Sequence, residues 1–276
     1  MNAEEFVRLY QSGQRNFNRT LVLQVDLRQA QLIGIDLSGA GLIDADLRGI
    51  DLGGANLRWA KLAGADLRKA DLTCIDLTGA NLVGADLREA KLRRAKLCGA
   101  DLAGAKLTGA VLWSADLRSA KMDGANLCGS DLYRVDLRES QMIRADLSHA
   151  RLSGADLRRV SLASAKLCRA DLSESCLAEA NLHQTNLSQA NLSRANLRRA
   201  DLRRANLQRA NLRKADLRDA NLGLTVFNGV NLEEALVSDA QLALAATLNN
   251  AILPDRSLCT VLHPFSDLET NQHFDW

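Results

Sequence analysis

One apolar position recurs every five residues from Leu27 to Leu232. This central position is Leu at 39 of its 42 occurrences, and Met122, Met142 and Phe227 fill the other three. The residue two places earlier is small and is mostly Ala. Exceptions at this small position include Ile35, Ser130, Val160 and Thr185. Asp or Asn usually stands between the two, so the consensus is A-[DN]-L-x-x.

A period of five excludes both regular secondary structures. On an α-helix, five residues advance about 500°, so successive central residues would lie about 140° apart and no apolar face would persist. On a continuous strand, an odd period would send alternate central residues to opposite faces. A chain that turns inward once per unit keeps every central and small residue inside. The pattern therefore predicts a β-solenoid of very short extended segments joined by bends.

The arginines that directly follow the central Leu indicate the length of one coil. Six pairs of these arginines are four units apart, as in Arg28 and Arg48, whereas two pairs are three units apart. This favours four units per coil without settling the number. Hydrophobic residues make up 47% of the chain but aromatic ones only 4%, so the interior is expected to consist of stacked Leu and Ala rather than a mixed core.

The tandem A-[DN]-L-x-x units over about residues 16–246 resemble the pentapeptide-repeat proteins. The resemblance implies an all-β fold, a right-handed quadrilateral β-helix with four pentapeptides per coil and therefore about ten coils. At about 4.8 Å per coil the rod would be about 50 Å long, with a dry interior and no ligand cavity. The opening segment through Arg15-Asn16-Phe17 and the Leu253-Pro254-Asp255 ending also resemble cyanobacterial members of the family, which include regulators of heterocyst differentiation.

Residues 1–15 are expected to form a helical cap on the rod. Asn2 and Glu5 fit a capping box, and Gly13 is expected to stop the helix. The apolar residues spaced to cover the end of the rod are Phe6, Leu9 and Tyr10. The coil is expected to begin by residue 16, with Phe17 and Val22 at central positions.

Residues 247–276 are expected to form a C-terminal cap and tail. After Leu232 the repeat decays, and Val237, Leu242 and Thr247 are expected to keep the five-residue register. The tail residues expected to pack on the last coil are Val261, Leu262, Phe265, Phe274 and Trp276.

The side-chain chemistry does not favour an enzyme. The four histidines are scattered, the six cysteines form no C-x-x-C motif, and no phosphate loop or dinucleotide fingerprint is present. Cys128 and Cys168 would share a column but lie two coils apart, about 10 Å, which is too far for a disulfide. We therefore expect no catalytic site, no cofactor, no bound metal and no small-molecule substrate.

Charge and hydropathy limit the expected cellular location and the expected classes of binding partner. The 35 basic and 33 acidic residues leave a net charge of +2, which argues against nucleic-acid and membrane-surface binding. No apolar run of about 18 residues exists, so no membrane span is expected. The acidic start, with Glu4 and Glu5, does not fit a signal peptide. A cytoplasmic protein with reduced cysteines is expected.

Two outward columns pair Asp before the central Leu with Arg after it, on the faces centred at Leu27 and at Leu117. Because stacked arginines repel, the neighbouring Asp column is expected to offset them. Ladders that fix the register are one interpretation of this pattern. A phosphate-binding arginine track is the alternative, and the interleaved Asp argues against it.

Three outward groups are candidate protein-binding sites. The first is a column of small apolar residues beside glycines on the Leu42 face, containing Ile43, Ala63, Val83, Ala103, Ile143 and Ala163, with Asp123 among them. It is either a partner or self-association surface or an inert strip suited to β structure. The second is Trp113 and Tyr133, which are four units apart and near Arg93, Arg94 and Arg134.

The third candidate is a basic stretch at residues 191–220. It holds nine basic and three acidic residues, and residues 221–276 hold one basic and seven acidic ones. This asymmetry either steers an anionic partner or is neutralised internally. The arginines singled out as partner-binding are Arg198, Arg199, Arg203 and Arg204.

These observations lead to a non-enzymatic, cytoplasmic protein-binding scaffold or regulator, present as a monomer or weak dimer. The resemblance adds a role in cyanobacterial signalling or heterocyst differentiation. One alternative is a DNA-mimicking protein that binds DNA gyrase or another topoisomerase, as in the quinolone-resistance members of the family. Those members are strongly acidic, unlike this chain with its net charge of +2. A purely structural spacer is the other alternative.

Overall fold

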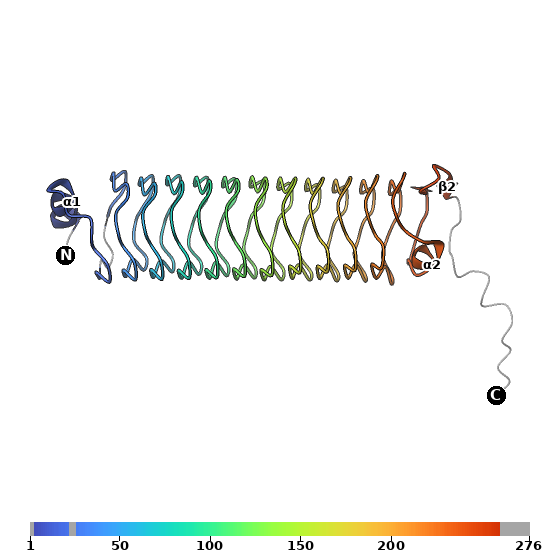
Figure 1. The fold of residues 1–276 in the computed structure, drawn as a ribbon, viewed down its shortest axis with the longest axis horizontal. Coiled ribbons are helices and arrows are strands. Elements are labelled where there is room, and N and C mark those ends of the chain that lie inside the picture. The colour runs from blue at the N-terminus through green and yellow to red at the C-terminus, as the bar shows by residue number, and fades with distance from the viewer. Residues whose placement is uncertain (1–2, 22–25, 260–276) are drawn as a thin grey trace, which may run out of the picture.

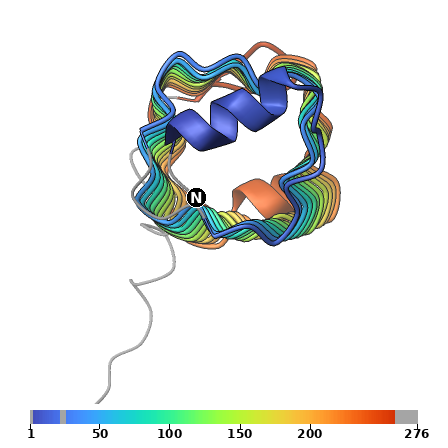
Figure 2. The ribbon, with the colours of Figure 1, turned by 90° about the vertical axis from the view of Figure 1, so that its left-hand side faces the viewer.

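The computed structural model describes residues 3–21 and 26–259, which form a rod of stacked coils (Figure 1). Parallel backbone bridges join each unit to the fourth unit after it, from Asn16 with Asp36 to Asp216 with Leu236. Four units therefore make one coil, and Figure 2 shows the resulting four-sided cross-section. The predicted β-solenoid is present, built from isolated bridges instead of continuous strands.

Every unit bends in the same way. The amide of the small residue donates to the carbonyl of the preceding central residue, as in Ala30 N to Leu27 O at 3.1 Å. The residue directly before the small residue has φ between +52° and +68° in the described units from Arg19 to Glu234. A positive φ at only the third residue of a turn is the type II pattern. The sharp corners of the square therefore come from one repeated turn.

The outward Asp or Asn before the central residue completes this turn. Its side-chain oxygen accepts a hydrogen bond from the amide two residues later, as in Val83 N to Asn81 Oδ1 at 3.1 Å and Arg68 N to Asp66 Oδ1 at 3.2 Å. Asp and Asn make this local bond readily because their side chains are short. The Asp and Asn of the consensus are thus explained by the fold, without invoking a catalytic carboxylate.

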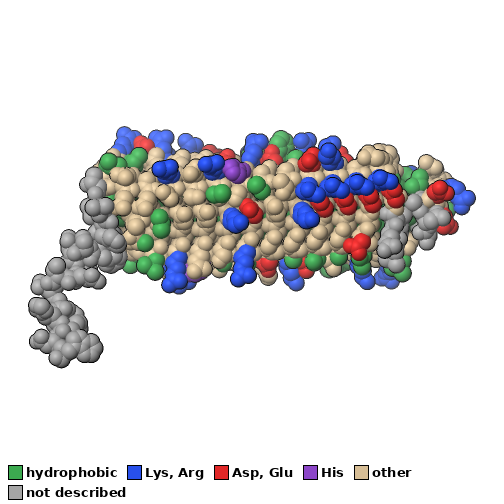
Figure 3. All heavy atoms as spheres, turned by 180° about the vertical axis from the view of Figure 1, so that it is seen from behind, with side chains coloured by type: hydrophobic (Ala, Val, Ile, Leu, Met, Phe, Trp, Pro, Cys, Tyr) green, Lys and Arg blue, Asp and Glu red, His purple; other side chains and the backbone are tan. Residues whose placement is uncertain are grey.

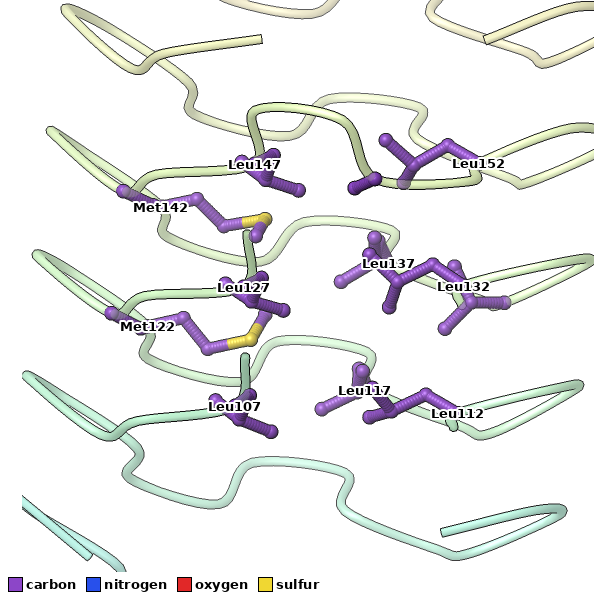
Figure 4. Packing of buried hydrophobic residues seen from close by; sticks show 14 of the residues in the cluster. Leu107, Leu112, Leu117, Met122, Leu127, Leu132, Leu137, Met142, Leu147 and Leu152 are labelled. Carbon is purple, nitrogen blue, oxygen red and sulfur yellow. The ribbon is translucent and has the colours of Figure 1, made fainter. Parts of the chain in front are cut away.

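The interior is a set of Leu columns with small residues between them. From Leu32 to Leu232, no central side chain is more than 1% exposed. Figure 4 shows Met122 and Met142 stacked beside Leu107, Leu127 and Leu147. Where a hydroxyl replaces Ala at the small position it bonds to the chain, as in Ser130 Oγ to Leu127 O at 2.7 Å, so no unpaired polar group is created.

Helix α1 (Ala3–Gln11) lies across the N-terminal end of the rod (Figure 2). The Phe6 side chain is buried, and its ring centroid lies 4.4 Å from that of Phe17. Tyr10 Oη donates to Ile33 O at 2.9 Å. Gly13, with φ of +101°, follows the helix as expected. Asn2 and Val22 lie outside the described residues.

The C-terminal end combines a short helix with a two-stranded sheet. Helix α2 (Asp239–Leu242) begins with a capping box between Ser238 and Gln241. The Gln241 side-chain amide also donates to Leu217 O and Ala220 O of the preceding coil, at 2.8 and 2.9 Å. Strand β1 (Ala251–Ile252) then pairs antiparallel with strand β2 (Leu258–Cys259).

The repeat register shifts by one residue after α2. Val226 bridges to Thr247 and not to Ala246, so Thr247 precedes the central position and Leu248, 8% exposed, occupies it. The expectation that Thr247 keeps the five-residue register was wrong because α2 adds one residue to this coil. The tail residues expected to pack on the last coil lie outside the described residues, namely Val261, Leu262, Phe265, Phe274 and Trp276.

Candidate protein-binding surfaces

The paired Asp and Arg columns form continuous ladders on the surface. Arg68 Nη2 lies 2.6 Å from Asp66 Oδ2 of its own unit, and Arg48 Nε of the preceding coil lies 3.7 Å from the same oxygen. Figure 3 shows rows of basic and acidic side chains aligned along the rod. Hydrogen bonds from Arg68 are the main cause that lowers the pKa of Asp66. In this ladder the arginines are engaged by carboxylates, which disfavours a phosphate-binding track.

The apolar strip comprises Ile43, Ala63, Val83, Ala103, Ile143 and Ala163. Backbone hydrogen bonds align this column, as in Gly64 N to Val83 O and Gly124 N to Ile143 O, both 2.9 Å. Ile43, Val83 and Ile143 are 39%, 40% and 40% exposed. Asp123 interrupts the strip, and its Oδ1 accepts a hydrogen bond from Ile143 N at 2.8 Å.

The corner beside the apolar strip carries no side chains over several coils. A Cβ built on Gly84, Gly104 or Gly124 would meet no other atom within 4 Å. The backbone is therefore open to close approach along this edge. The strip and the bare corner therefore lie side by side on the Leu42 face.

The aromatic patch comprises Arg93, Arg94, Trp113, Tyr133 and Arg134. The Trp113 and Tyr133 ring centroids lie 6.2 Å apart with an interplanar angle of 68°. The two residues are 38% and 36% exposed. The sequence therefore placed these two aromatic residues correctly on the surface and next to each other.

The basic stretch is largely neutralised by carboxylates within it or beside it. Arg198 and Arg199 lie 3.8 and 3.9 Å from Asp219 Oδ2. Arg203 Nη2 lies 2.7 Å from Asp201 Oδ2. Arg204 forms no ion pair with any residue that the structure describes. These contacts favour internal neutralisation over a continuous basic surface.

One exposed aromatic residue was missed by the sequence reasoning. Trp59 is 63% exposed and stands at the positive-φ corner of its unit. An ideal Cβ on Gly79, one coil further on, would lie 2.1 Å from Trp59 Cζ3, so the ring covers this glycine. The available signal was its position two residues after a central Leu, where a side chain must point outward.

The surface offers open hollows beside the ladders. One hollow of about 330 Å³ is lined by Gln29, Arg48, Gly49, Arg68, Lys69, Arg88 and Glu89. Within residues 3–21 and 26–259, no three His, Cys, Asp or Glu side chains gather as metal ligands. No helix in that part of the chain is long and apolar enough to cross a bilayer.

A family model for pentapeptide repeats (8 copies) matches overlapping segments that together run from residue 23 to residue 242. HetL of the cyanobacterium Nostoc sp. strain PCC 7120, a pentapeptide repeat protein involved in heterocyst differentiation regulation, is 37% identical, with 94% of this chain and 100% of HetL covered and a TM-score of 0.33. Full-length QnrB1, a plasmid-mediated fluoroquinolone resistance protein, is 13% identical, with 87% and 94% covered and a TM-score of 0.33. Rfr23 from the cyanobacterium Cyanothece 51142 is 26% identical, with 54% and 98% covered and a TM-score of 0.28. No curated protein is significantly similar to the chain.

Proposed function

This chain belongs to the pentapeptide-repeat family, and we propose that it is a non-enzymatic scaffold or regulator that binds a protein partner on a flat face of the rod. The apolar strip carries the proposal, because Ile43, Val83 and Ile143 stand exposed in one column beside bare backbone. A row of aligned apolar side chains is costly to leave in water and is typical of protein interaction sites.

The rod is well suited to this role because its faces are rigid. Each unit is joined to the next coil by backbone hydrogen bonds such as Leu82 N to Asp101 O at 2.6 Å and Gly84 N to Ala103 O at 2.9 Å. The central Leu side chains beneath the face are packed and dry. A preformed face loses little conformational entropy on binding, so modest contacts suffice for affinity.

The contacts of the acidic side chains do not favour the DNA-mimic alternative. A protein that imitates DNA needs a continuous negative surface, whereas here Asp66 and Asp116 each lie within 2.7 Å of an arginine nitrogen. With a net charge of +2, the surface would not attract a DNA-binding protein electrostatically.

We further propose that α1 and residues 239–259 cap a right-handed rod of about ten coils. An open coil exposes unpaired backbone and apolar side chains, which invites end-to-end association. The buried Phe6 side chain covers the first coil, and the Gln241 side-chain amide donates hydrogen bonds to two carbonyls of the last regular coil. The rod is therefore expected to be monomeric when its partner is absent. The resemblance of the terminal segments adds a cytoplasmic role in cyanobacterial signalling or heterocyst differentiation.

The test is a lysate pull-down with three baits. They are the wild type, a Val83→Lys/Ile143→Lys variant, and a Thr108→Lys/Ser188→Lys variant that adds the same charge after a central Leu on the Leu27 face. Circular dichroism verifies that all three are folded. We expect one protein to be retained by the wild type and the control and lost from the strip variant, and calorimetry with that purified protein to give the same ranking.

Retention of the same protein by the strip variant would refute the strip as the binding surface. If all three baits retain nothing, including from lysates of differentiating cells, the scaffold function is refuted and the spacer interpretation replaces it.

A further inference from the structure

The aromatic patch occupies two adjacent columns on the Leu32 face, with Arg93, Trp113 and Tyr133 in one column and Arg94 and Arg134 at the neighbouring corner. Backbone bonds from Arg94 N to Trp113 O at 2.9 Å and from Ser114 N to Tyr133 O at 3.0 Å set Arg93, Trp113 and Tyr133 on consecutive coils. The Leu32 and Leu42 faces are the second and fourth sides of a four-sided coil. The aromatic patch therefore points away from the apolar strip.

The arginines of the patch contact the rings. The Arg93 Cζ lies 4.8 Å from the Trp113 ring centroid, and the Arg134 Cζ lies 5.2 Å from that of Tyr133. These distances fit cation–π contacts, which hold the guanidinium groups in place at the surface. The patch is thus an ordered, positively charged surface that also presents two aromatic rings.

None of the three patch arginines forms an ion pair with a residue in the described part of the chain, which sets them apart from the ladder arginines. The neighbouring cations are already neutralised, since Lys91 Nζ lies 3.4 Å from Asp71 and Arg151 Nη1 lies 3.3 Å from Asp131. Three exposed, unpaired positive charges therefore remain together. Their mutual repulsion is relieved when an anionic group binds between them.

We propose that the aromatic patch binds a short acidic segment of a protein partner, with carboxylates on Arg93, Arg94 and Arg134 and an apolar side chain on the two rings. The proposal rests on the scaffold function above but uses a different face. From Arg93 to Arg134 the patch spans two coils, about 10 Å, which matches about three residues of extended chain. Arg–carboxylate bonds can be bidentate, which adds geometric specificity.

A single-stranded nucleic acid fits the patch less well. Such ligands bind by stacking bases on exposed ring faces along an extended basic groove. Here the Trp113 and Tyr133 rings meet at an interplanar angle of 68° and offer no parallel faces for successive bases. The basic patch spans only two coils, and beyond it Lys91 and Arg151 are already paired with Asp71 and Asp131, so among the described residues it does not continue into a basic groove.

The test is a fluorescence anisotropy titration at low salt with a fluorescein-labelled peptide, Glu-Glu-Leu-Glu-Glu. The same peptide with Gln for Glu and a labelled decathymidylate are the comparison probes. The variants are Arg93→Gln/Arg134→Gln, Trp113→Ala, and the control Arg144→Gln/Arg169→Gln. Arg144 and Arg169 also form no ion pair among the described residues, and like Arg134 they stand at positive-φ corners.

We expect the Glu peptide to bind the wild type and the control equally. Binding of the Glu peptide should weaken at least tenfold in the double arginine variant and several-fold in Trp113→Ala. It should also weaken several-fold when the salt concentration is raised. The Gln peptide should bind the wild type at least tenfold more weakly than the Glu peptide does. Equal binding of both peptides, or no loss in the double arginine variant, would overturn the proposal. Tighter decathymidylate binding that is lost in the same variant would assign the patch to nucleic acid instead. The titration contains no partner of the apolar strip, so its outcome is independent of the pull-down.

Discussion

The consensus Asp or Asn is predicted to stabilise the rod mainly through its bond to the turn amide, and Asp66 allows this to be measured. Asp66 Oδ1 accepts from Arg68 N at 3.2 Å, and the carboxylate also meets Arg68 and Arg48 at 2.6 and 3.7 Å. Asp66→Asn keeps an acceptor for the amide and removes both ion pairs. Asp66→Ala removes all three contacts. The difference between the two variants therefore measures the hydrogen bonds that Oδ1 accepts, which are the turn bond and the one from Arg68 Nε at 2.8 Å, and the uncharged Asn81 separates the turn bond from the other.

The structure sets the expected magnitudes. The Asp66 side chain is 27% exposed and its arginine partners are more so, so the ion pairs should contribute about 0.5 kcal/mol in total. A hydrogen bond to a backbone amide contributes about 1 kcal/mol. We expect Asp66→Asn to cost about 0.5 kcal/mol and Asp66→Ala about 1.5 kcal/mol. Asn81→Ala is the matched control, since Asn81 Oδ1 accepts from Val83 N and the side chain carries no charge, and it should cost about 1 kcal/mol.

Two assays suit a stack of repeats, whose unfolding need not be two-state. Urea unfolding followed by circular dichroism ranks the variants. Amide hydrogen exchange reads the turn locally, and exchange at Arg68 should rise about fivefold more in Asp66→Ala than in Asp66→Asn. If Asp66→Asn costs as much as Asp66→Ala while Asn81→Ala costs nothing, the ladder charge, and not the turn bond, explains the consensus.

Three further results are expected. Gly84→Ala should cost about 1 kcal/mol because its φ is +65° and its surroundings are open. Gly79→Ala should cost more because the new Cβ would meet the Trp59 ring. Coinciding urea midpoints of the two variants would contradict this contact. Hydrogen bonds from arginine hold the pKa of Asp26 at about 2, below its ordinary value of 3.8. The stabilisation that the ionised carboxylate contributes is complete above about pH 4 and is lost as the pH falls towards 2. Urea midpoints should therefore fall over that interval, and less so in Asp26→Asn. Arg256 contacts two glutamates of the last regular coil at 2.8 and 3.2 Å, so Arg256→Ala should increase hydrogen exchange in β1 and β2 while exchange in the mid-rod coils stays unchanged.

The sequence predicts the interior of the rod almost completely, because burial depends on one strict period. An apolar residue every fifth position has a single way to stay inside, and the predicted columns appear with Met122 and Met142 in line with their Leu neighbours. The sequence also indicated four units per coil through the spacing of the arginines. The physical reason is visible in the ladders, where arginines on consecutive coils share carboxylates.

The C-terminal end could not be predicted because the period no longer holds there. Residues 238–242 fit the five-residue pattern by composition, yet Ser238 and Gln241 favour a helical turn through a capping box. This local preference adds one residue and moves Leu248 to the central position. The cost is visible at the junction, where Thr247 Oγ1 and Asn249 Oδ1 are buried without a hydrogen-bond partner among the described residues.

The roles of the five positions in each unit determine where function is encoded in this fold. Two positions of each unit are buried, and the position before the central residue is taken by the turn-forming Asp or Asn. The residue directly after the central one and the residue at the positive-φ corner both face solvent, and the corner accepts charged and aromatic residues as well as glycine. Val83 of the apolar strip and Trp113 of the aromatic patch occupy the first of these positions, and Arg134 occupies the second. The partners of the rod are therefore expected to be determined by two residues in five, and changes elsewhere in the unit should act first on stability.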